Sequence, residues 1–260
     1  MTELIARDLT SAATRRGAAA VLDGCNLGLY GGDLVAVIGP NGAGKSSLLR
    51  AIAGQLSHSG HVTIDGRDAR AMPPAARARA IGYLPQRDET VGPVRVDTMV
   101  GLGRYAWGAS PGRLSPEDQR AVDAAIAETG CGAIATRTID TLSGGERARA
   151  ALARVFAAQT PVLLLDEPVA ALDPAYQIAS MRLIRGRADA GAAVLAVLHD
   201  INLAVQFADR ILWMDRGQIV AETPANDTMI AGRFRKLFDA DILTSGDGGG
   251  RIATAALVGR

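Results

Sequence analysis

The sequence predicts an α/β fold with a largely parallel sheet and helices on both of its faces. The first observation is a set of short, uninterrupted apolar runs, which are typical of strands buried on both sides. The second is that segments with helical periodicity separate these runs, because alternating strands and helices favour a parallel sheet. The runs are residues 34–38, 162–165 and 193–198.

Bulk composition limits the classes of protein. The 260 residues are 48% hydrophobic and 21% charged, and the net charge is +1. This length fits one large domain or one domain with an inserted subdomain. The near-zero charge argues against nucleic acid as a partner. Neither a membrane-spanning apolar run of about 18 residues nor a secretory signal at residues 1–8 is evident, so any work at a membrane requires a partner.

The N-terminal part of the sequence predicts strands, a glycine-rich loop and a helix. Residues 2–8 and 21–30 alternate between apolar and polar side chains, as half-buried strands do. The run at 34–38 stops at Gly39, and helical periodicity begins at Lys45. Residues 61–66 and 81–86 predict further strands, with a helix from Pro73 between them. The alternating strands predict an antiparallel β subdomain beside the parallel core.

The rest of the sequence predicts a helical insertion, followed by further strands and helices of the core and by a tail. Residues 88–158 are rich in helical periodicity, at 118–128 and 145–158, and Thr160-Pro161 ends this stretch. Helices are also predicted at 175–186 and 202–208, and a hairpin joins 211–214 to 218–221. We therefore predict a core and β subdomain over 1–87 and 159–240, an inserted helical subdomain over 88–158 and a flexible tail over 241–260.

A glycine-rich loop between the first buried strand and its helix matches the phosphate-binding pattern GxxxxGK[ST]. Its glycines allow backbone N–H groups to turn inward around phosphates, and the helix dipole points its positive end at them. Lys45 is predicted to reach the β- and γ-phosphates, and the Ser46 hydroxyl to bind Mg²⁺. Lysine is rare here, since Lys45 and Lys236 are the only two among 28 basic residues. The predicted nucleotide-binding residues of this loop are Gly39, Pro40, Asn41, Gly42, Ala43, Gly44, Lys45, Ser46 and Ser47.

Two carboxylates, Asp166 and Glu167, follow the buried run at 162–165. Ligands of open α/β sheets bind at this carboxyl edge of the strands. Neighbouring strand residues point to opposite sides, which permits two separate roles. Asp166 is predicted to hold Mg²⁺ and Glu167 to polarise the attacking water.

A second anion-binding helix start is predicted at Leu142-Ser143-Gly144-Gly145-Glu146. One nucleotide does not need two phosphate cradles about a hundred residues apart. The second cradle, Ser143, Gly144 and Gly145, is therefore expected to serve a nucleotide held by another copy of the chain.

Together these motifs resemble the ATP-binding subunits of ABC transporters. Leu142–Glu146 looks like that family's signature motif, which closes over the ATP of the opposite subunit. Gln86 matches the glutamine that senses Mg²⁺ and the attacking water, and Asp173 in Ala171-Leu172-Asp173 matches the interface loop next to nucleotide. His199 matches the switch histidine at the γ-phosphate. Six motifs occur in family order over about residues 30–220.

The resemblance implies a P-loop NTPase (RecA-like) core that hydrolyses ATP with Mg²⁺. It assigns catalysis to Glu167, His199 and Gln86, and the metal to Ser46, Gln86 and Asp166. It implies a homodimer, integral membrane permease subunits, an extracytoplasmic substrate-binding protein and a peripheral location on the cytoplasmic face of the membrane. Residues 88–108, with Tyr105 and Trp107, would form the docking surface unless these aromatics pack the insertion's core. A fainter resemblance to importers of iron chelates, haem or cobalamin rests on the Gly-Arg-Tyr stretch at 103–105, the short chain and the tail together.

The sequence departs from the family at residues 11–16, which lack the aromatic that stacks on adenine; an arginine plane there could substitute. Three alternatives remain open at this point: a soluble ABC ATPase in DNA repair or translation, the motor of an exporter, and a P-loop kinase. A kinase leaves the signature and His199 unexplained. Cys25 and Cys131 lack metal or redox spacing, and His58 and His61 lack a third metal ligand.

Overall fold

The computed structural model describes residues 2–11, 21–86, 92–110, 112–227, 229–238, 241–245 and 252–256. A six-stranded sheet lies at its centre in the order β10-β9-β3-β8-β7-β6, and β9, β3, β8, β7 and β6 run parallel. A second sheet has the order β2-β1-β4-β5 with antiparallel pairing. The six-stranded sheet contains β3 (Leu34–Ile38), β6 (Ile81–Leu84), β7 (Val162–Asp166), β8 (Ala193–Val197), β9 (Arg210–Asp215) and β10 (Gln218–Pro224).

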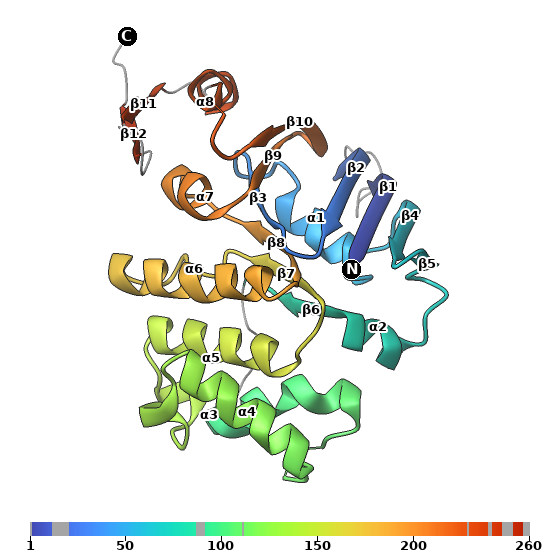
Figure 1. Ribbon diagram of the computed structural model, residues 1–260, viewed down its shortest axis with the longest axis vertical. Coiled ribbons are helices and arrows are strands. Elements are labelled where there is room, and N and C mark those ends of the chain that lie inside the picture. Colours follow the sequence, from blue (N-terminus) through green and yellow to red (C-terminus); the bar gives the residue numbers. More distant parts are fainter. Residues whose placement is uncertain are drawn as a thin grey trace.

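The central strands are covered on both faces, as their continuous apolar sequences predict. In β3, Leu34, Ala36 and Ile38 join the core on one face, whereas Val35 and Val37 join the core on the other. The same alternation holds for β7 and β8. Helices α5 (Gly144–Ala157), α6 (Pro174–Asp189), α7 (Ile201–Phe207) and α8 (Ile230–Phe238) pack on the first face. Helix α1 (Lys45–Ile52) and the antiparallel sheet pack on the second (Figure 1).

The antiparallel sheet carries its own alternating pattern. Residues Leu4, Ala6 and Leu9 of β1 are buried, and the intervening side chains are more exposed. This half-buried pattern explains why alternation in the sequence identified these strands. The sheet comprises β1 (Glu3–Ser11), β2 (Leu22–Tyr30), β4 (Ser59–Ile64) and β5 (Arg67–Asp68), and helix α2 (Pro74–Ala80) leads from it to β6.

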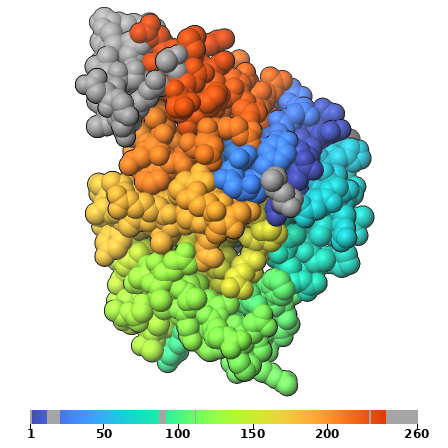
Figure 2. Space-filling view, in the orientation of Figure 1, coloured from blue at the N-terminus to red at the C-terminus, as the bar shows by residue number. Residues whose placement is uncertain are grey.

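Between β6 and β7 the described chain is helical and lies at one end of the molecule (Figures 1 and 2). Helix α4 (Pro116–Glu128) begins with a capping box between Ser115 and Asp118, two residues before the start predicted at residue 118. The sequence did not identify α3 (Val96–Gly101) or the 3₁₀ helix η1 (Leu102–Trp107), whose glycines weaken helical periodicity. Short 3₁₀ helices η2 (Gly132–Ile134) and η3 (Ile139–Thr141) precede α5.

The C-terminal stretch contains regular secondary structure that the sequence did not predict. Strands β11 (Asp241–Ser245) and β12 (Ile252–Ala256) form an antiparallel pair. The sequence predicted a flexible tail over 241–260 and did not identify these two strands. Helix α8 before them was also missed, and its rings Phe234 and Phe238 stack with centroids 4.5 Å apart.

Candidate functional site

The strand order brings the predicted site residues to one edge of the sheet. Strands β3, β8, β7 and β6 are parallel neighbours, so their carboxyl ends lie side by side. Gly39 follows β3, His199 lies just beyond β8, Asp166 ends β7 and Gln86 follows β6 (Figure 1). Segments separated by up to 160 residues in the chain thus meet where open α/β sheets bind ligands.

The loop between β3 and α1 requires glycine at several positions. Gly42 and Gly44 have φ of 81° and 100°, which side chains other than glycine rarely adopt. A Cβ at Gly39 would lie 2.2 Å from the backbone oxygen of Met214. Helix α1 starts without a side-chain cap and has no acidic residue in its first turn. The backbone donors of that turn are therefore left for an anion.

Lys45 lies inside this loop, with its side chain largely buried. Its Nζ donates hydrogen bonds to the backbone oxygens of Gly39 at 2.7 Å and Pro40 at 3.0 Å. Burial lowers the pKa of Lys45, and the negative charges of Glu167 and Asp166 oppose that effect. The loop carbonyls hold the ammonium group beside the start of α1, where phosphates of a nucleotide would need a cation.

Ser46 and Asp166 form a pair of oxygen ligands beside the loop. The Ser46 hydroxyl donates to Asp166 Oδ1 at 3.0 Å, and Asp166 is only 2% exposed. Burial raises the pKa of Asp166, although the bond from Ser46 opposes the rise. A hydroxyl and a buried carboxylate are the hard donors that Mg²⁺ prefers, so the pair fits the predicted metal. Ser47 differs, because its hydroxyl accepts a bond from Arg50 Nη2 at 3.2 Å.

Glu167 is held between Gln86 and His199. Its Oε1 accepts a hydrogen bond from Gln86 Nε2 at 2.8 Å and lies 2.6 Å from His199 Nε2. Its backbone has φ of 53°, in the left-handed region that favours glycine. Such a conformation costs roughly 1–3 kcal/mol and persists where the surroundings fix it, commonly at functional sites. All three residues that the resemblance assigns to catalysis are therefore in contact.

The second predicted cradle is at the start of α5. Ser143 Oγ accepts from the Glu146 backbone N–H at 3.3 Å, and Glu146 Oε2 accepts from the Ser143 N–H at 2.8 Å. This capping box leaves the next two N–H groups, of Gly144 and Gly145, without a side-chain cap. A Cβ at Gly144 would meet nothing within 4 Å.

Of the residues predicted to act across a dimer interface, only one lines the pocket at this edge of the sheet. Gly144 lines a pocket of about 340 Å³ together with Gln86, Asp166 and Glu167. Asp173 caps α6, since its Oδ1 accepts from the Tyr176 backbone N–H at 3.1 Å. Ser143, Gly145 and Asp173 are not among the residues that line this pocket.

Sequence reasoning missed a polar pocket next to Ser46 and Asp166, the predicted metal ligands. It has a volume of about 590 Å³ and is lined by Tyr83, Arg50 and Arg154 as well as Ser46, Gln86 and Asp166. Burial, with a smaller contribution from Asp166, raises the pKa of Tyr83 to about 12. Arg50 and Tyr83 belong to no motif, so only the fold reveals their position.

The predicted docking segment exposes large apolar side chains. Tyr105 is 68% exposed, Trp107 is 47% exposed and Leu102 is 38% exposed. A pocket of about 510 Å³ is lined by residues of both η1 and α2. This exposure favours a surface role over packing in the interior of the insertion. Residues 87–91, at the start of the predicted segment, and 12–16, at the expected adenine site, lie outside the described residues.

Two further features were tested within the described part of the chain. No helix there is long and apolar enough to cross a membrane. No group of three or more His, Cys, Asp and Glu residues is arranged there to hold a metal ion. His58 instead contacts Arg70 Nη2 through Nδ1 at 2.8 Å, and both cysteines are free and buried.

Replacing Asp166 by asparagine is expected to stabilise the Mg²⁺-free protein and to lower Mg²⁺-dependent ATP turnover at least ~100-fold, since metal-ion catalysis supplies several kcal/mol. The folded-state pKa of Asp166 is raised, so its burial destabilises the fold increasingly as pH rises from about 4 through that pKa. Asparagine removes this titration, and its Oδ1 still accepts from Ser46. Urea unfolding between pH 4 and 8 tests the idea, which fails if the variant is less stable than wild type at neutral pH.

Comparisons with known proteins find relatives that cover most of this chain. The family described as ABC transporter matches residues 22–170. The Hemin import ATP-binding protein HmuV of Pseudomonas entomophila is 42% identical over 235 residues, which cover 88% of this chain and 91% of that protein. HmuV of Streptomyces coelicolor is 42% identical over 229 residues, covering 87% of this chain and 80% of its own length.

Solved structures show the same fold. A metal-chelate type ABC transporter in an inward-facing conformation has a TM-score of 0.80 at 22% identity, with 98% of this chain and 97% of that chain covered. The dimeric post-hydrolysis state of the ATP-binding cassette MJ0796, bound to ADP and Pi, has a TM-score of 0.78 at 25% identity. It covers 86% of this chain and 99% of its own.

Proposed function

Because this chain belongs to the ABC transporter family and is an ATP hydrolase of the ABC type, we propose that it powers import of haem, an iron chelate or cobalamin through a separate membrane subunit. The observation that supports this most is the high identity to two hemin import ATP-binding proteins over most of both lengths. The site geometry adds support, because the groups needed for hydrolysis converge at one sheet edge.

In this proposal the loop Gly39–Ser47 binds the ATP phosphates. The uncapped first turn of α1 supplies backbone donors, and Lys45 supplies a positive charge at the β- and γ-phosphates. Lys45 would exchange its bonds to the Gly39 and Pro40 oxygens for phosphate oxygens. Catalysis of phosphoryl transfer is mostly positioning and charge neutralisation, which this loop provides.

Ser46, Asp166 and Gln86 are proposed to hold Mg²⁺. Bound there, the ion would neutralise charge on the β- and γ-phosphates. Glu167 accepts a proton from the attacking water, and its left-handed backbone aims the carboxylate between Gln86 and His199. His199 Nε2 now contacts Glu167, and it would donate to the γ-phosphate when that phosphate replaces Glu167 as its partner. Gln86 orients the water through its side-chain amide.

A second copy of the chain is proposed to complete each site. Ser143, Gly144 and Gly145 would meet the γ-phosphate held by the other copy, and Asp173 would lie at the interface. The open space beside Gly144 and its uncapped N–H support this role. Hydrolysis then removes the γ-phosphate contacts and lets the dimer open, as in other nucleotide switches.

The membrane subunit is proposed to dock on η1 and the 510 Å³ pocket between η1 and α2. The exposed side chains of Leu102, Tyr105 and Trp107 give this surface the apolar character of an interface. The chain would thus lie on the cytoplasmic face of the membrane as a peripheral subunit. An extracytoplasmic binding protein would deliver the cargo to the membrane subunit, without touching this chain.

Co-purification tests the proposal. A tagged Glu167→Gln variant should retain ATP, and in mild detergent with MgATP it should bring down a many-helix membrane protein. The Tyr105→Ser variant serves as the matched control and should recover less of it. Recovery of ribosomes, DNA-repair proteins or no membrane protein would instead support a soluble ATPase. Identification of an exporter would overturn the direction of transport.

A further inference from the structure

The four residues that join α5 to β7, here called the 158–161 junction, receive polar contacts from η1. Trp107 Nε1 donates to the backbone oxygen of Ala158 at 3.0 Å. Arg104 Nη1 donates to Gln159 Oε1 at 3.1 Å and to the Ala157 oxygen at 3.1 Å. Three consecutive residues before β7 are therefore bonded to the segment that carries the proposed docking surface.

Arg104 is fixed firmly enough to act as a rigid link. It is 2% exposed, and its Nε donates to Asp118 Oδ1 at 2.8 Å within a buried ion pair. Its guanidinium also lies 4.8 Å from the centre of the Trp107 ring. A Cβ at Gly103 would lie 2.2 Å from the Arg154 oxygen, so the backbone of η1 is seated directly on α5. A displacement of η1 must therefore carry the end of α5 and the junction with it.

Strand β7 is bracketed by two residues in the left-handed conformation. Gln159 before it has φ of 51°, and Glu167 after it has φ of 53°. Each such backbone costs roughly 1–3 kcal/mol and is maintained by its contacts. Arg104 holds the Gln159 side chain, and Gln86 and His199 hold the Glu167 side chain. The backbone conformation at both ends of β7 therefore depends on these side-chain contacts and is expected to change when they are lost.

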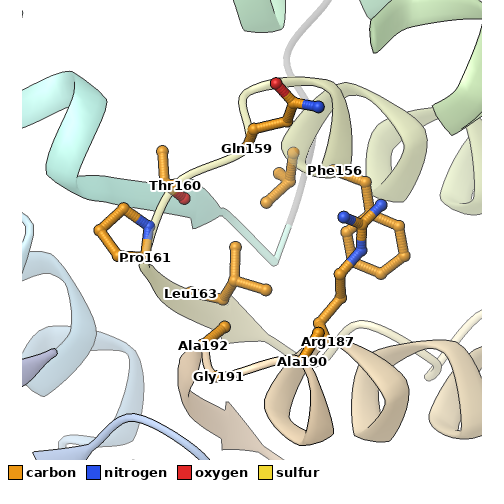
Figure 3. Close-up of a pocket in the computed structure, with 10 residues that line it drawn as sticks. Phe156, Gln159, Thr160, Pro161, Leu163, Arg187, Ala190, Gly191 and Ala192 are labelled. Atoms are coloured by element: carbon orange, nitrogen blue, oxygen red, sulfur yellow. The ribbon is translucent and has the colours of Figure 1, made fainter. Parts of the chain in front are cut away.

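The 158–161 junction also borders open space. A pocket of about 390 Å³ lies there, lined by Gln159, Thr160 and Pro161 together with Phe156, Leu163 and Arg187 (Figure 3). Arg187 lies over the Phe156 ring with Cζ 4.5 Å from its centre and forms the opposite wall. A shift of the junction into this space would meet no close-packed core, which normally resists such motion.

We infer that Arg104 is a positioning residue that couples η1 to the catalytic strand through Gln159. Docking of the membrane subunit on η1 shifts the junction, and β7 passes that shift to Asp166 and Glu167. Coupling is reciprocal, so MgATP bound at the site must alter the surroundings of Trp107. The inference rests on the proposed function, because it assigns a route between the proposed docking surface and the proposed ATP site.

Tryptophan fluorescence tests the link without the membrane partner. The Glu167→Gln variant, which should hold MgATP, is titrated with MgATP while emission and ATP binding are followed separately. The second tryptophan, Trp213, is 1% exposed and bonded to Thr223. The Trp107→Phe variant measures the emission of Trp213 alone, which is subtracted as background. We expect an emission change that depends on Trp107. Adding Gln159→Gly should reduce this change with the affinity for MgATP retained, since it removes the side-chain bond to Arg104 while glycine accepts the left-handed backbone and the variant keeps its fold.

Asp65→Gly is the matched control. Asp65 also has a left-handed φ, 49°, and its Oδ1 accepts one hydrogen bond, from the Glu3 N–H, but it lies in the turn between β4 and β5. This variant should keep the full Trp107 response. A Trp107 signal that ignores MgATP, or one that survives Gln159→Gly unchanged, overturns the link while the proposed function stands. Failure to bind MgATP at all overturns the proposed function and the link together.

Discussion

Replacing Glu167 by glutamine is expected to lower kcat for ATP hydrolysis about 10²–10⁴-fold, the usual contribution of a general base, with little change in MgATP affinity. The amide oxygen of glutamine can still accept the bond from Gln86, so the geometry of the site survives. The change removes the proton acceptor alone. ATP turnover and equilibrium binding of a fluorescent ATP analogue measure the two quantities.

Glu3→Gln provides the control for this prediction, because Glu3 is an exposed glutamate on β1 far from the site in sequence. It should leave both kcat and binding unchanged. If Glu167→Gln kept near-normal turnover, Glu167 would not be the base. A simultaneous loss of binding would instead indicate that the substitution distorted the phosphate loop.

Replacing Arg104 by leucine is expected to lower the free energy of unfolding by about 3–5 kcal/mol, since it leaves the buried Asp118 carboxylate without its cation. A second substitution, Asp118→Leu, should restore part of the lost free energy of unfolding, because it removes the unpaired buried carboxylate. The bonds from Arg104 to Ala157 and Gln159 are lost in both variants. The reversal is only partial because Asp118→Leu also removes the bonds that Ser115 donates to Asp118 in the capping box of α4. Urea denaturation measures the difference.

An exposed ion pair in the same region is the comparison. Arg95 and Asp97 are 2.5 Å apart, but their side chains are 50% and 33% exposed. Solvent and salt screen exposed pairs, so Arg95→Leu should cost far less than Arg104→Leu. Equal costs for the two variants would show that burial does not set the energy of the Arg104 pair.

The sequence predicted the central sheet well because burial on both faces leaves an unmistakable apolar run. Strand β3 has the predicted bounds, and β8 differs only at its last residue. Helices α3 and η1 were not predicted, because their glycines and aromatics follow no helical period. Those glycines serve close packing instead, as the 2.2 Å approach at Gly103 shows.

Some residues of the site and its surroundings could be predicted from the sequence, and others could not. The phosphate loop and the two carboxylates at the end of β7 carry fixed spacing, so their residues could be named in advance. Arg104 and Gln159 could not, because an arginine at an arbitrary position is normally exposed and its partner lies 55 residues away. The left-handed backbone of Glu167 also has no sequence signal, since such conformations usually select glycine.

The capping box at the start of α5 bears on which anions can close the proposed dimer. Glu146 occupies part of that helix end with a carboxylate of this chain, and Arg137 Nη1 holds the carboxylate at 2.9 Å. A free anion arriving from solution gains little there, because it must compete with a negative group that is already paired. A γ-phosphate held rigidly by the facing copy loses no further translational freedom. Millimolar inorganic phosphate should therefore be a poor substitute for ATP, and release of the cleaved phosphate would be favoured as soon as it is detached.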